Sequence, residues 1–251
     1  MEDLKNKWHD AEKNAHIIGW DFSVMDGRMY EADELMQWDY KSLIKKYLRA
    51  EDTLLDMDTG GGEFLLTLGH DNNLISVTES YPPNVELCRQ RLEPLGIKVY
   101  DVPADGILPF GDAEFDIVIN RHGSFNAEEI YRILKKGGHF ITQQVGDDND
   151  RELVELLMGD IPKPFPGMNL TVQKKVFEDA GFEILESGEN FLPIEFYDTG
   201  ALIWFAKIIE WEFPGFAVEK YYDNLLNAEK LISEKGKAEG RVHRYMIVAR
   251  K

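Results

Sequence analysis

Short apolar runs alternate with helical patterns through the middle of the chain. Runs rich in leucine or β-branched residues occupy residues 53–57, 74–78, 97–102, 115–119 and 139–143. Steps of about twenty residues between such runs, with helical spacing in between, are typical of βαβ units. The pattern predicts a mostly parallel sheet flanked by helices.

The helical patterns have recognisable starts and stops. Pro82 and Pro83 stand where a first helical turn accepts proline, and Gly137 and Gly138 end a later pattern. The predicted helices cover residues 40–48, 82–95, 127–135, 152–158, 170–180 and 201–209. Cys88 falls on the apolar stripe of the second of these, so we expect it in the core. Further strands are predicted at 182–185 and 242–249.

Two stretches outside this alternation are rich in aromatic residues. They are residues 1–50 and residues 191–240, and the second has a helical pattern. We expect an N-terminal segment over 1–50 and a main domain over 51–251 that carries a helical cap insertion at about 191–240. If both segments reach the ligand edge of the sheet, Trp20, Phe22, Arg28 and Tyr197 are candidates for contact with a substrate.

Composition narrows the class of protein. One cysteine among 251 residues forms no internal disulfide and supplies no cysteine-based zinc site. Together with an N-terminus that lacks the apolar core of a signal peptide, this predicts a cytoplasmic protein without a membrane segment and without a metal. The net charge of −18 disfavours nucleic acid and favours a small-molecule partner.

A glycine cluster carries the clearest chemical signal. The leucine-rich run ends in Asp56-Met57-Asp58-Thr59, and Gly60, Gly61 and Gly62 follow before a helical pattern begins. Such a turn lets a ligand approach backbone N–H groups. A phosphate-binding loop is excluded because no lysine follows the glycines, and a dinucleotide fingerprint is weakened because Leu65 stands where a small residue is needed.

Asp56, Gly60 and Gly62 resemble the first motif of the class I S-adenosylmethionine (SAM)-dependent methyltransferases. Asp58 departs from that motif, because it replaces the usual first glycine. The resemblance implies a Rossmann-like, three-layer α/β sandwich with a seven-stranded, mostly parallel sheet whose last strand is antiparallel. It also implies SAM as the cofactor and methyl transfer by direct displacement.

Later residues continue the resemblance in register. Glu79 matches the acidic residue that accepts hydrogen bonds from the ribose, and Asp105 with Gly106 precedes a Leu-Pro-Phe pattern like that of the third motif. The resemblance implies that Asp105 binds the adenine amino group. The patterns Phe-Asp-Ile-Val at 115–118 and Leu-Lys-Lys-Gly-Gly at 134–138 look like the next two motifs.

Polar residues follow two predicted strands at the ligand edge. Asn120 is expected to contact the cofactor. Arg121 could bind a carboxylate of an acceptor or pair with a surface acid, and Gln143 and Gln144 could orient an acceptor or cap their strand. His122 is the candidate catalytic base, because the usual pKa of histidine lies near neutral pH, although an in-line nucleophile needs no base when it is held close.

Three other functions stay open. An RNA base methyltransferase is disfavoured by the charge, a non-catalytic SAM-binding protein is kept open by Asp58, and an NAD-linked oxidoreductase is disfavoured by Leu65. A monomer and a homodimer are equally compatible with the sequence. The acceptor and the type of atom that is methylated are not specified.

Overall fold

The computed structural model describes residues 2–17, 22–102 and 107–251. The chain divides into two compact units. Unit 1 comprises Met1–Met36, Gly146–Pro166 and Asn190–His243, and unit 2 comprises Gln37–Val145, Gly167–Glu189 and Arg244–Lys251. Each unit is described by itself below.

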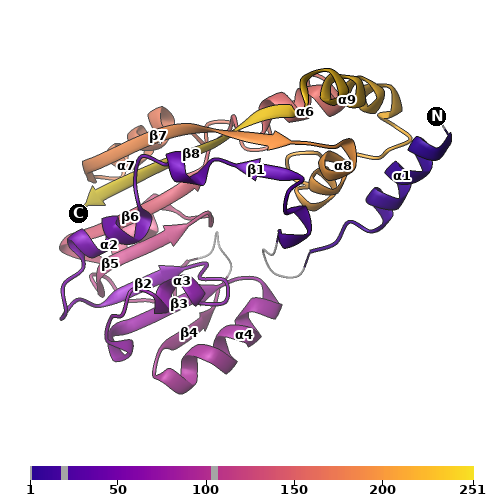
Figure 1. Ribbon diagram of the computed structural model, residues 1–251. Helices are drawn as coiled ribbons and strands as arrows, with labels where there is room; N and C mark the ends of the chain where they lie inside the picture. Colours follow the sequence, from indigo (N-terminus) through magenta and orange to yellow (C-terminus); the bar gives the residue numbers. More distant parts are fainter. Residues whose placement is uncertain (1, 18–21, 103–106) are drawn as a thin grey trace. The chain divides into compact units, whose positions relative to one another are not determined.

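Unit 2 contains the alternating strands and helices that the sequence predicts (Figure 1). Its elements are α2 (Tyr40–Tyr47), β2 (Leu54–Met57), α3 (Glu63–Leu66), β3 (Ile75–Glu79), α4 (Pro82–Leu92), β4 (Lys98–Asp101), β5 (Phe115–Arg121), α5 (Ala127–Ile133), β6 (Leu134–Val145) and α7 (Leu170–Asp179). Strands β7 (Glu183–Phe196) and β8 (Ala238–Arg250) contribute residues to both units.

The strands form one sheet with the order β1-β7-β8-β6-β5-β2-β3-β4. Strands β4, β3, β2, β5 and β6 pair in parallel, and β8 pairs antiparallel with β6. The chain runs outward from β2 through β3 to β4 and then returns to β5 on the other side of β2. This reversal makes the carboxyl ends of β2 and β5 a topological switch point, where open α/β sheets bind their ligands.

The two faces of this sheet are covered by different helices. Alternate residues of β2 point to opposite faces, so that Leu54 lies in one apolar cluster and Leu55 in the other. The first cluster includes side chains of α2, α3 and α4, and the second includes side chains of α5 and α7. Helices on both faces of a parallel sheet confirm the predicted three-layer α/β sandwich, and the antiparallel last strand is confirmed as well.

Unit 1 is mainly helical and has its own core. Its elements are α1 (Glu2–Lys13), β1 (Met29–Glu31), α6 (Arg151–Met158), α8 (Thr199–Ile208) and α9 (Tyr222–Lys235), together with the shared parts of β7 and β8. Helix α8 begins at its N-cap Asp198, whose side chain accepts a hydrogen bond from the N–H of Ala201. Nearly all of α8 is buried, as its apolar sequence predicts.

No helix within the described parts of the chain is both long and apolar enough to cross a membrane.

Three details differ from the prediction. Among the residues that the structure describes, the sheet has eight strands instead of seven, because residues 29–31 pair antiparallel with the end of β7. The cap predicted to begin at 191 starts as strand, since Leu192, Ile194 and Phe196 are buried alternately and fit the two-residue period of β7. The helix predicted over 127–135 ends at Ile133, because Leu134 already pairs with β5.

Candidate functional site

The turn after β2 needs backbone conformations that most residues avoid. Asp58, Gly60 and Gly62 have φ angles of 54°, 65° and 76°. Aspartate is one of the few residues other than glycine that enter this left-handed region readily. Asp58 therefore keeps the turn geometry at the position where the family motif has glycine, and it adds a carboxyl group there.

The glycine turn packs closely against α4. A Cβ atom at Gly62 would lie 2.8 Å from methyl carbons of Leu92, and the Cys88 thiol donates a hydrogen bond to the carbonyl of Gly60 at 2.9 Å. Burial, together with the neighbouring acidic groups, raises the pKa of Cys88 to about 11. Cys88 is thus a buried, protonated thiol beneath the turn, which confirms its predicted place in the core.

Glu79 ends β3 beside the turn and is almost fully buried. Its Oε2 accepts a hydrogen bond from the N–H of Gly60 at 2.8 Å, and its Oε1 accepts from the N–H groups of Ser80 and Tyr81, both at 2.9 Å. A carboxylate has about four acceptor sites. One site on Oε2 is therefore left for a hydroxyl group of a ligand.

Two further carboxyl groups lie near Glu79. Asp56 is buried and accepts a hydrogen bond from the Thr59 hydroxyl at 2.6 Å. Burial raises the pKa of Asp56 to about 7, with the charges of Asp58 and Glu79 adding to the rise. Burial and the charge of Glu79 raise the pKa of Asp58 to about 6. A cationic ligand would relieve the repulsion among these groups, because an adjacent positive charge favours the ionised form.

These residues fit SAM, which carries a sulfonium, an ammonium and a ribose diol. No atom lies within 4 Å of the place where a Cβ atom of Gly60 would stand, Glu79 retains an acceptor site, and Asp58 offers a carboxylate. Gly61 belongs to the same turn, and a Cβ atom there would collide with the side chain of Glu63. The predicted cofactor residues Asp56, Asp58, Gly60–62 and Glu79 are thus brought together, although their contacts with SAM stay a prediction.

Asn120 occupies a different position from the one expected of a ligand contact. Its side chain is fully buried, its Nδ2 donates to the carbonyl of Met57, and its Oδ1 accepts from Nε2 of Gln144 at 2.5 Å. Gln144 also donates to Thr142 and to the carbonyl of Gly123. Asn120 therefore joins β2, β5 and β6 at the switch point, and its predicted contact with the cofactor is untested.

His122, Gln143 and Trp38 form a short hydrogen-bonded chain. The indole Nε1 of Trp38 donates to Oε1 of Gln143 at 2.8 Å, and Nε2 of Gln143 lies 3.3 Å from Nε2 of His122. Solvent reaches the His122 side chain, yet the protein packed around it and the charges of Arg244 and Arg121 lower its pKa to about 3. A histidine with so low a pKa is a weak base at neutral pH. The base role predicted for His122 stays untested, and this environment does not favour it.

Arg121 lies next to an aromatic pair. Its guanidinium carbon is 4.5 Å from the centre of the Phe64 ring, and Phe64 stacks on Tyr40 with a centroid distance of 5.4 Å. The Tyr40 hydroxyl is within hydrogen-bonding distance of the carbonyls of Asn120 and Ile141. Tyr40 therefore holds the ring of Phe64 in place by stacking, and Phe64 in turn contacts the guanidinium of Arg121 at the end of β5.

The remaining predicted site residues cannot be placed at this edge. Asp105, Gly106 and Trp20 lie outside the described residues. Phe22 and Arg28 belong to unit 1, as does Tyr197. Their structural partners are clear, and their contact with an acceptor stays a prediction.

Within unit 1 these three residues stabilise local structure. Phe22 packs edge-on against Trp204, with ring centroids 5.7 Å apart. Arg28 binds the N-cap of α8, Asp198, through two hydrogen bonds of 2.8 and 2.6 Å. The Tyr197 hydroxyl donates to Glu195 at 3.0 Å.

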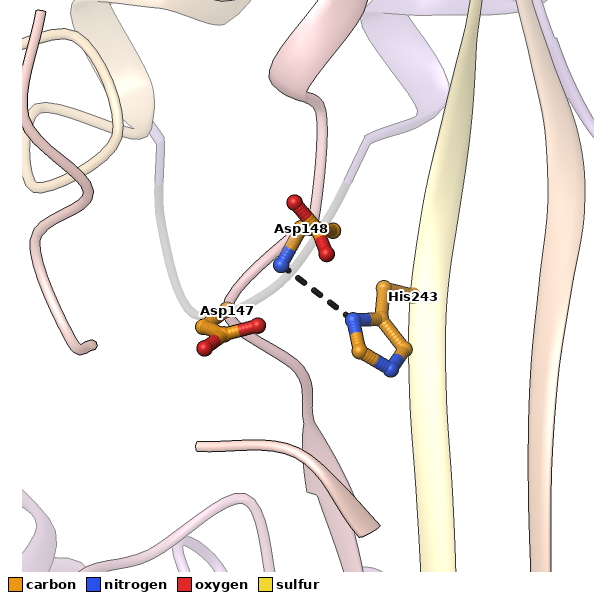
Figure 2. A group of neighbouring side chains, drawn as sticks. All are labelled: Asp147, Asp148 and His243. Carbon is orange, nitrogen blue, oxygen red and sulfur yellow. Dashed lines mark hydrogen bonds between the residues drawn. The ribbon is translucent and has the colours of Figure 1, made fainter. Parts of the chain in front are cut away.

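One group in unit 1 has the residue types of a metal site. Figure 2 shows Asp147, Asp148 and His243, and their potential ligand atoms lie within 4.8 Å of one another. However, the Lys163 ammonium is 2.7 Å from Asp148 and 3.4 Å from Asp147, and the Asp148 N–H donates to Nδ1 of His243 at 3.2 Å. A cation and a backbone donor thus already satisfy this group as an ion-paired network.

Several residues of the site were missed by the sequence reasoning. They are Trp38, Tyr40, Thr59 and Phe64. Thr59 was detectable, because it lies inside the glycine motif three residues after Asp56. The others depend on pairings between distant segments, such as Trp38 with Gln143, and no local pattern marks such pairings.

The part of the chain around the glycine turn is similar to a known protein family. Residues 55–142 match the sequence profile of a family described as a methyltransferase domain. No curated protein sequence matches the chain.

Solved structures share the fold at low sequence identity. A Bacillus halodurans C-125 protein provisionally named a methyltransferase is 19% identical, with a TM-score of 0.56, and the match covers 85% of this chain and 98% of that one. A functionally unknown protein from Deinococcus radiodurans R1 is 13% identical, with a TM-score of 0.61 and coverage of 88% and 90%. The YcgJ protein of Bacillus subtilis is 16% identical, with a TM-score of 0.58 and coverage of 84% and 97%.

Proposed function

We propose that the chain, whose residues 55–142 match the model of a methyltransferase domain, transfers the methyl group of SAM to a small or medium-sized acceptor by direct displacement. The observation that carries this proposal is the position of the glycine turn with Glu79, Asp56 and Asp58. All of them lie at the carboxyl ends of β2 and β3, beside the switch point.

In this proposal, the residues on one side of the switch point bind the cofactor and those on the other side bind the acceptor. SAM supplies an electrophilic methyl group on a positively charged sulfur. On the β3 side, Glu79 binds the ribose and the glycine turn accepts the rest of the cofactor. Asp58 and Asp56 favour a cation because their ionised forms are otherwise destabilised.

On the β6 side, Arg121, His122 and Gln143 border the place of the acceptor. Displacement at a methyl group requires a nucleophile held in line and close to the sulfonium, and this positioning supplies much of the rate enhancement. A strong general base is not required, which agrees with the low pKa of His122. The acceptor itself and the atom type that is methylated are not specified by this arrangement.

The charge of the chain supports a small acceptor over RNA. Acidic residues exceed basic residues by 18, and no basic surface of the kind that binds a phosphate backbone was evident from the sequence. Cytoplasmic location and a monomeric or homodimeric state remain predictions of the sequence.

Turnover tests the proposal. The purified protein is incubated with SAM and pools of small amines, phenols, thiols and carboxylic acids, and formation of S-adenosylhomocysteine is measured. We expect product above the acceptor-free background with at least one pool, and loss of that product in a Glu79→Ala variant. Tight SAM binding without product from any pool would contradict methyl transfer to a small molecule and would favour a non-catalytic binding protein.

A further inference from the structure

Positively charged side chains gather at one corner of the acidic unit 2. Arg121 ends β5, Arg244 lies on β8 opposite Val145 of β6, and His122 follows Arg121, with its backbone N–H donating to the carbonyl of Gln143 at 2.9 Å. We call the two arginines, together with the neutral His122, the cationic corner. It lies on the same sheet face as the apolar cluster of α2, because Gln143 pairs with Arg121 on one side and with Met246, a member of that cluster, on the other.

Arg121 is held in a way that leaves its donors available. Its guanidinium carbon lies over the Phe64 ring, 4.5 Å from the ring centre, and an aromatic ring offers no oxygen or nitrogen acceptor to the guanidinium N–H groups. Within residues 2–17, 22–102 and 107–251, Arg121 forms no ion pair, and its charge partly offsets the rise in the pKa of Asp56 that burial causes. An exposed, supported guanidinium edge is suited to binding a carboxylate through two parallel hydrogen bonds.

The hydrogen bonds that link Trp38 to Gln143 and Gln143 to His122 determine which ring nitrogen of His122 carries the hydrogen. An indole N–H can only donate, so the Gln143 atom facing Trp38 is the amide oxygen. The Gln143 amide nitrogen, which also only donates, then faces Nε2 of His122. Nε2 must therefore be the unprotonated nitrogen of a neutral ring, and Nδ1 carries the hydrogen. His122 thus offers a hydrogen-bond donor to a ligand rather than a lone pair.

We propose that the cationic corner binds a carboxylate of the methyl acceptor, with Arg121 as the bidentate partner and the Nδ1–H of His122 as a further donor, so that the acceptor is a small carboxylic acid. Trp38 and Gln143 are positioning residues, since they act on the acceptor through His122. This inference rests on the proposed function, because it assigns an acceptor class to the same site. A cationic acceptor would be repelled by the arginines, and a neutral one would lack the charge that pairs with Arg121.

Nuclear magnetic resonance of the full chain tests the proposal. The protein is first saturated with S-adenosylhomocysteine, so that the carboxylate of the cofactor is already present. Acetate and benzoate are then titrated, with acetamide and benzamide as neutral isosteres, while the indole N–H resonance of Trp38 and the ring nitrogens of His122 are observed. We expect saturable shifts with the two carboxylates and none with the amides.

Substitutions of Arg121 identify the binding group. Arg121→Met should weaken binding of the carboxylates at least about tenfold, and Arg121→Lys, which keeps the charge but loses the planar fork, should retain part of it. Arg89→Met is the matched control, because Arg89 is an exposed arginine of α4 away from the carboxyl ends of β5 and β6, and it should bind like the wild type.

The same variants separate the two possible sources of a carboxylate. S-adenosylhomocysteine carries the methionine carboxylate and 5′-methylthioadenosine lacks it. Equal affinity of wild type and Arg121→Met for both ligands supports the assignment to the acceptor. Weakened binding of S-adenosylhomocysteine alone would overturn it, because Arg121 would then serve the cofactor. If S-adenosylhomocysteine binds but neither added carboxylate does, the acceptor class is wrong and the proposed function stands. If S-adenosylhomocysteine does not bind the wild type, both fail.

Discussion

At the scale of single residues, the carboxyl groups beside the glycine turn decide how the site responds to pH. Asp58 has the left-handed backbone that the motif usually gives to glycine, and Asp56 is buried behind it. Their raised pKa values mean that the folded, ligand-free protein retains protons that the unfolded chain releases at lower pH.

The pKa of Asp56 predicts a fall in stability as the pH rises. The group is protonated in the folded state up to about pH 7 but ionises in the unfolded chain near its ordinary value of 3.8. Its stabilising contribution is therefore complete below pH 3.8 and is lost as the pH rises through 7.

Urea unfolding of wild type and Asp56→Asn between pH 4 and pH 8 measures this effect. The wild type loses this contribution as the pH rises and the variant does not. The free energy of unfolding of the variant minus that of the wild type should therefore increase by about 2–4 kcal/mol between pH 4 and pH 8. Asp10→Asn on the exposed face of α1 is the control and should follow the wild type. Parallel curves for wild type and Asp56→Asn would show that Asp56 does not titrate in this range.

Glu79 should contribute directly to cofactor affinity. Glu79→Ala removes the acceptor of three backbone N–H groups and the remaining site for a ribose hydroxyl. We expect calorimetry to show SAM binding weaker by about 1–3 kcal/mol. Glu79→Gln, which keeps one oxygen, should lose less, and unchanged affinity of Glu79→Ala would remove this residue from the site.

Trp38 should control the tautomer of His122. In Trp38→Phe the indole donor is lost, so the Gln143 amide is free to turn its oxygen towards His122. The ring nitrogen chemical shifts should then report a mixture of tautomers and a higher pKa than in the wild type. Retention of the Nδ1–H form in this variant would contradict the positioning role of Trp38.

At the scale of elements, the glycine turn depends on its fit against α4. Gly62 has a positive φ and no room for a methyl group beside Leu92, whereas Gly69 has a similar φ of 67° and nothing within 4 Å. Gly62→Ala should destabilise the protein by about 1–3 kcal/mol more than Gly69→Ala, because overpacking adds to backbone strain. Thermal unfolding of the two variants measures the difference, and equal losses would mean that α4 yields to the added methyl group.

The sequence predicted the elements whose periodicity is strong and local. The sequence located strands β2 to β6 and helices α2, α4, α6 and α7. Buried parallel strands appear in a sequence as short apolar runs, and residues such as proline and glycine mark where the helices begin and end. Strand β1 was missed because three residues give no period, and the extension of β7 was hidden by the aromatic content of residues 191–196.

The sequence predicted residues on both sides of the candidate site, but not the contacts that hold Arg121 and His122 in place. The glycine turn and Glu79 follow the strand ends in a fixed local order, which a sequence can reveal. The support of Arg121 by Phe64 and of His122 by Trp38 arises from contacts between segments far apart in the chain. Such contacts are set by packing, which periodicity does not encode.

At the scale of the whole molecule, net charge separates the proposed function from its RNA alternative. The chain has 18 more acidic than basic residues, so its net negative charge repels the negatively charged phosphate backbone of RNA. In a filter-binding assay at low salt, we expect no retention of total RNA with or without S-adenosylhomocysteine. Saturable retention that weakens with added salt would contradict the assignment to small acceptors.

Cofactor preference tests the central claim most directly. The wild-type chain is titrated calorimetrically with SAM, S-adenosylhomocysteine and NAD under identical conditions. The account predicts saturable micromolar binding of the two adenosyl ligands and no binding of NAD. Binding of NAD alone, or silence towards both adenosyl ligands, would contradict the assignment of the glycine turn, Glu79 and Asp58 to SAM.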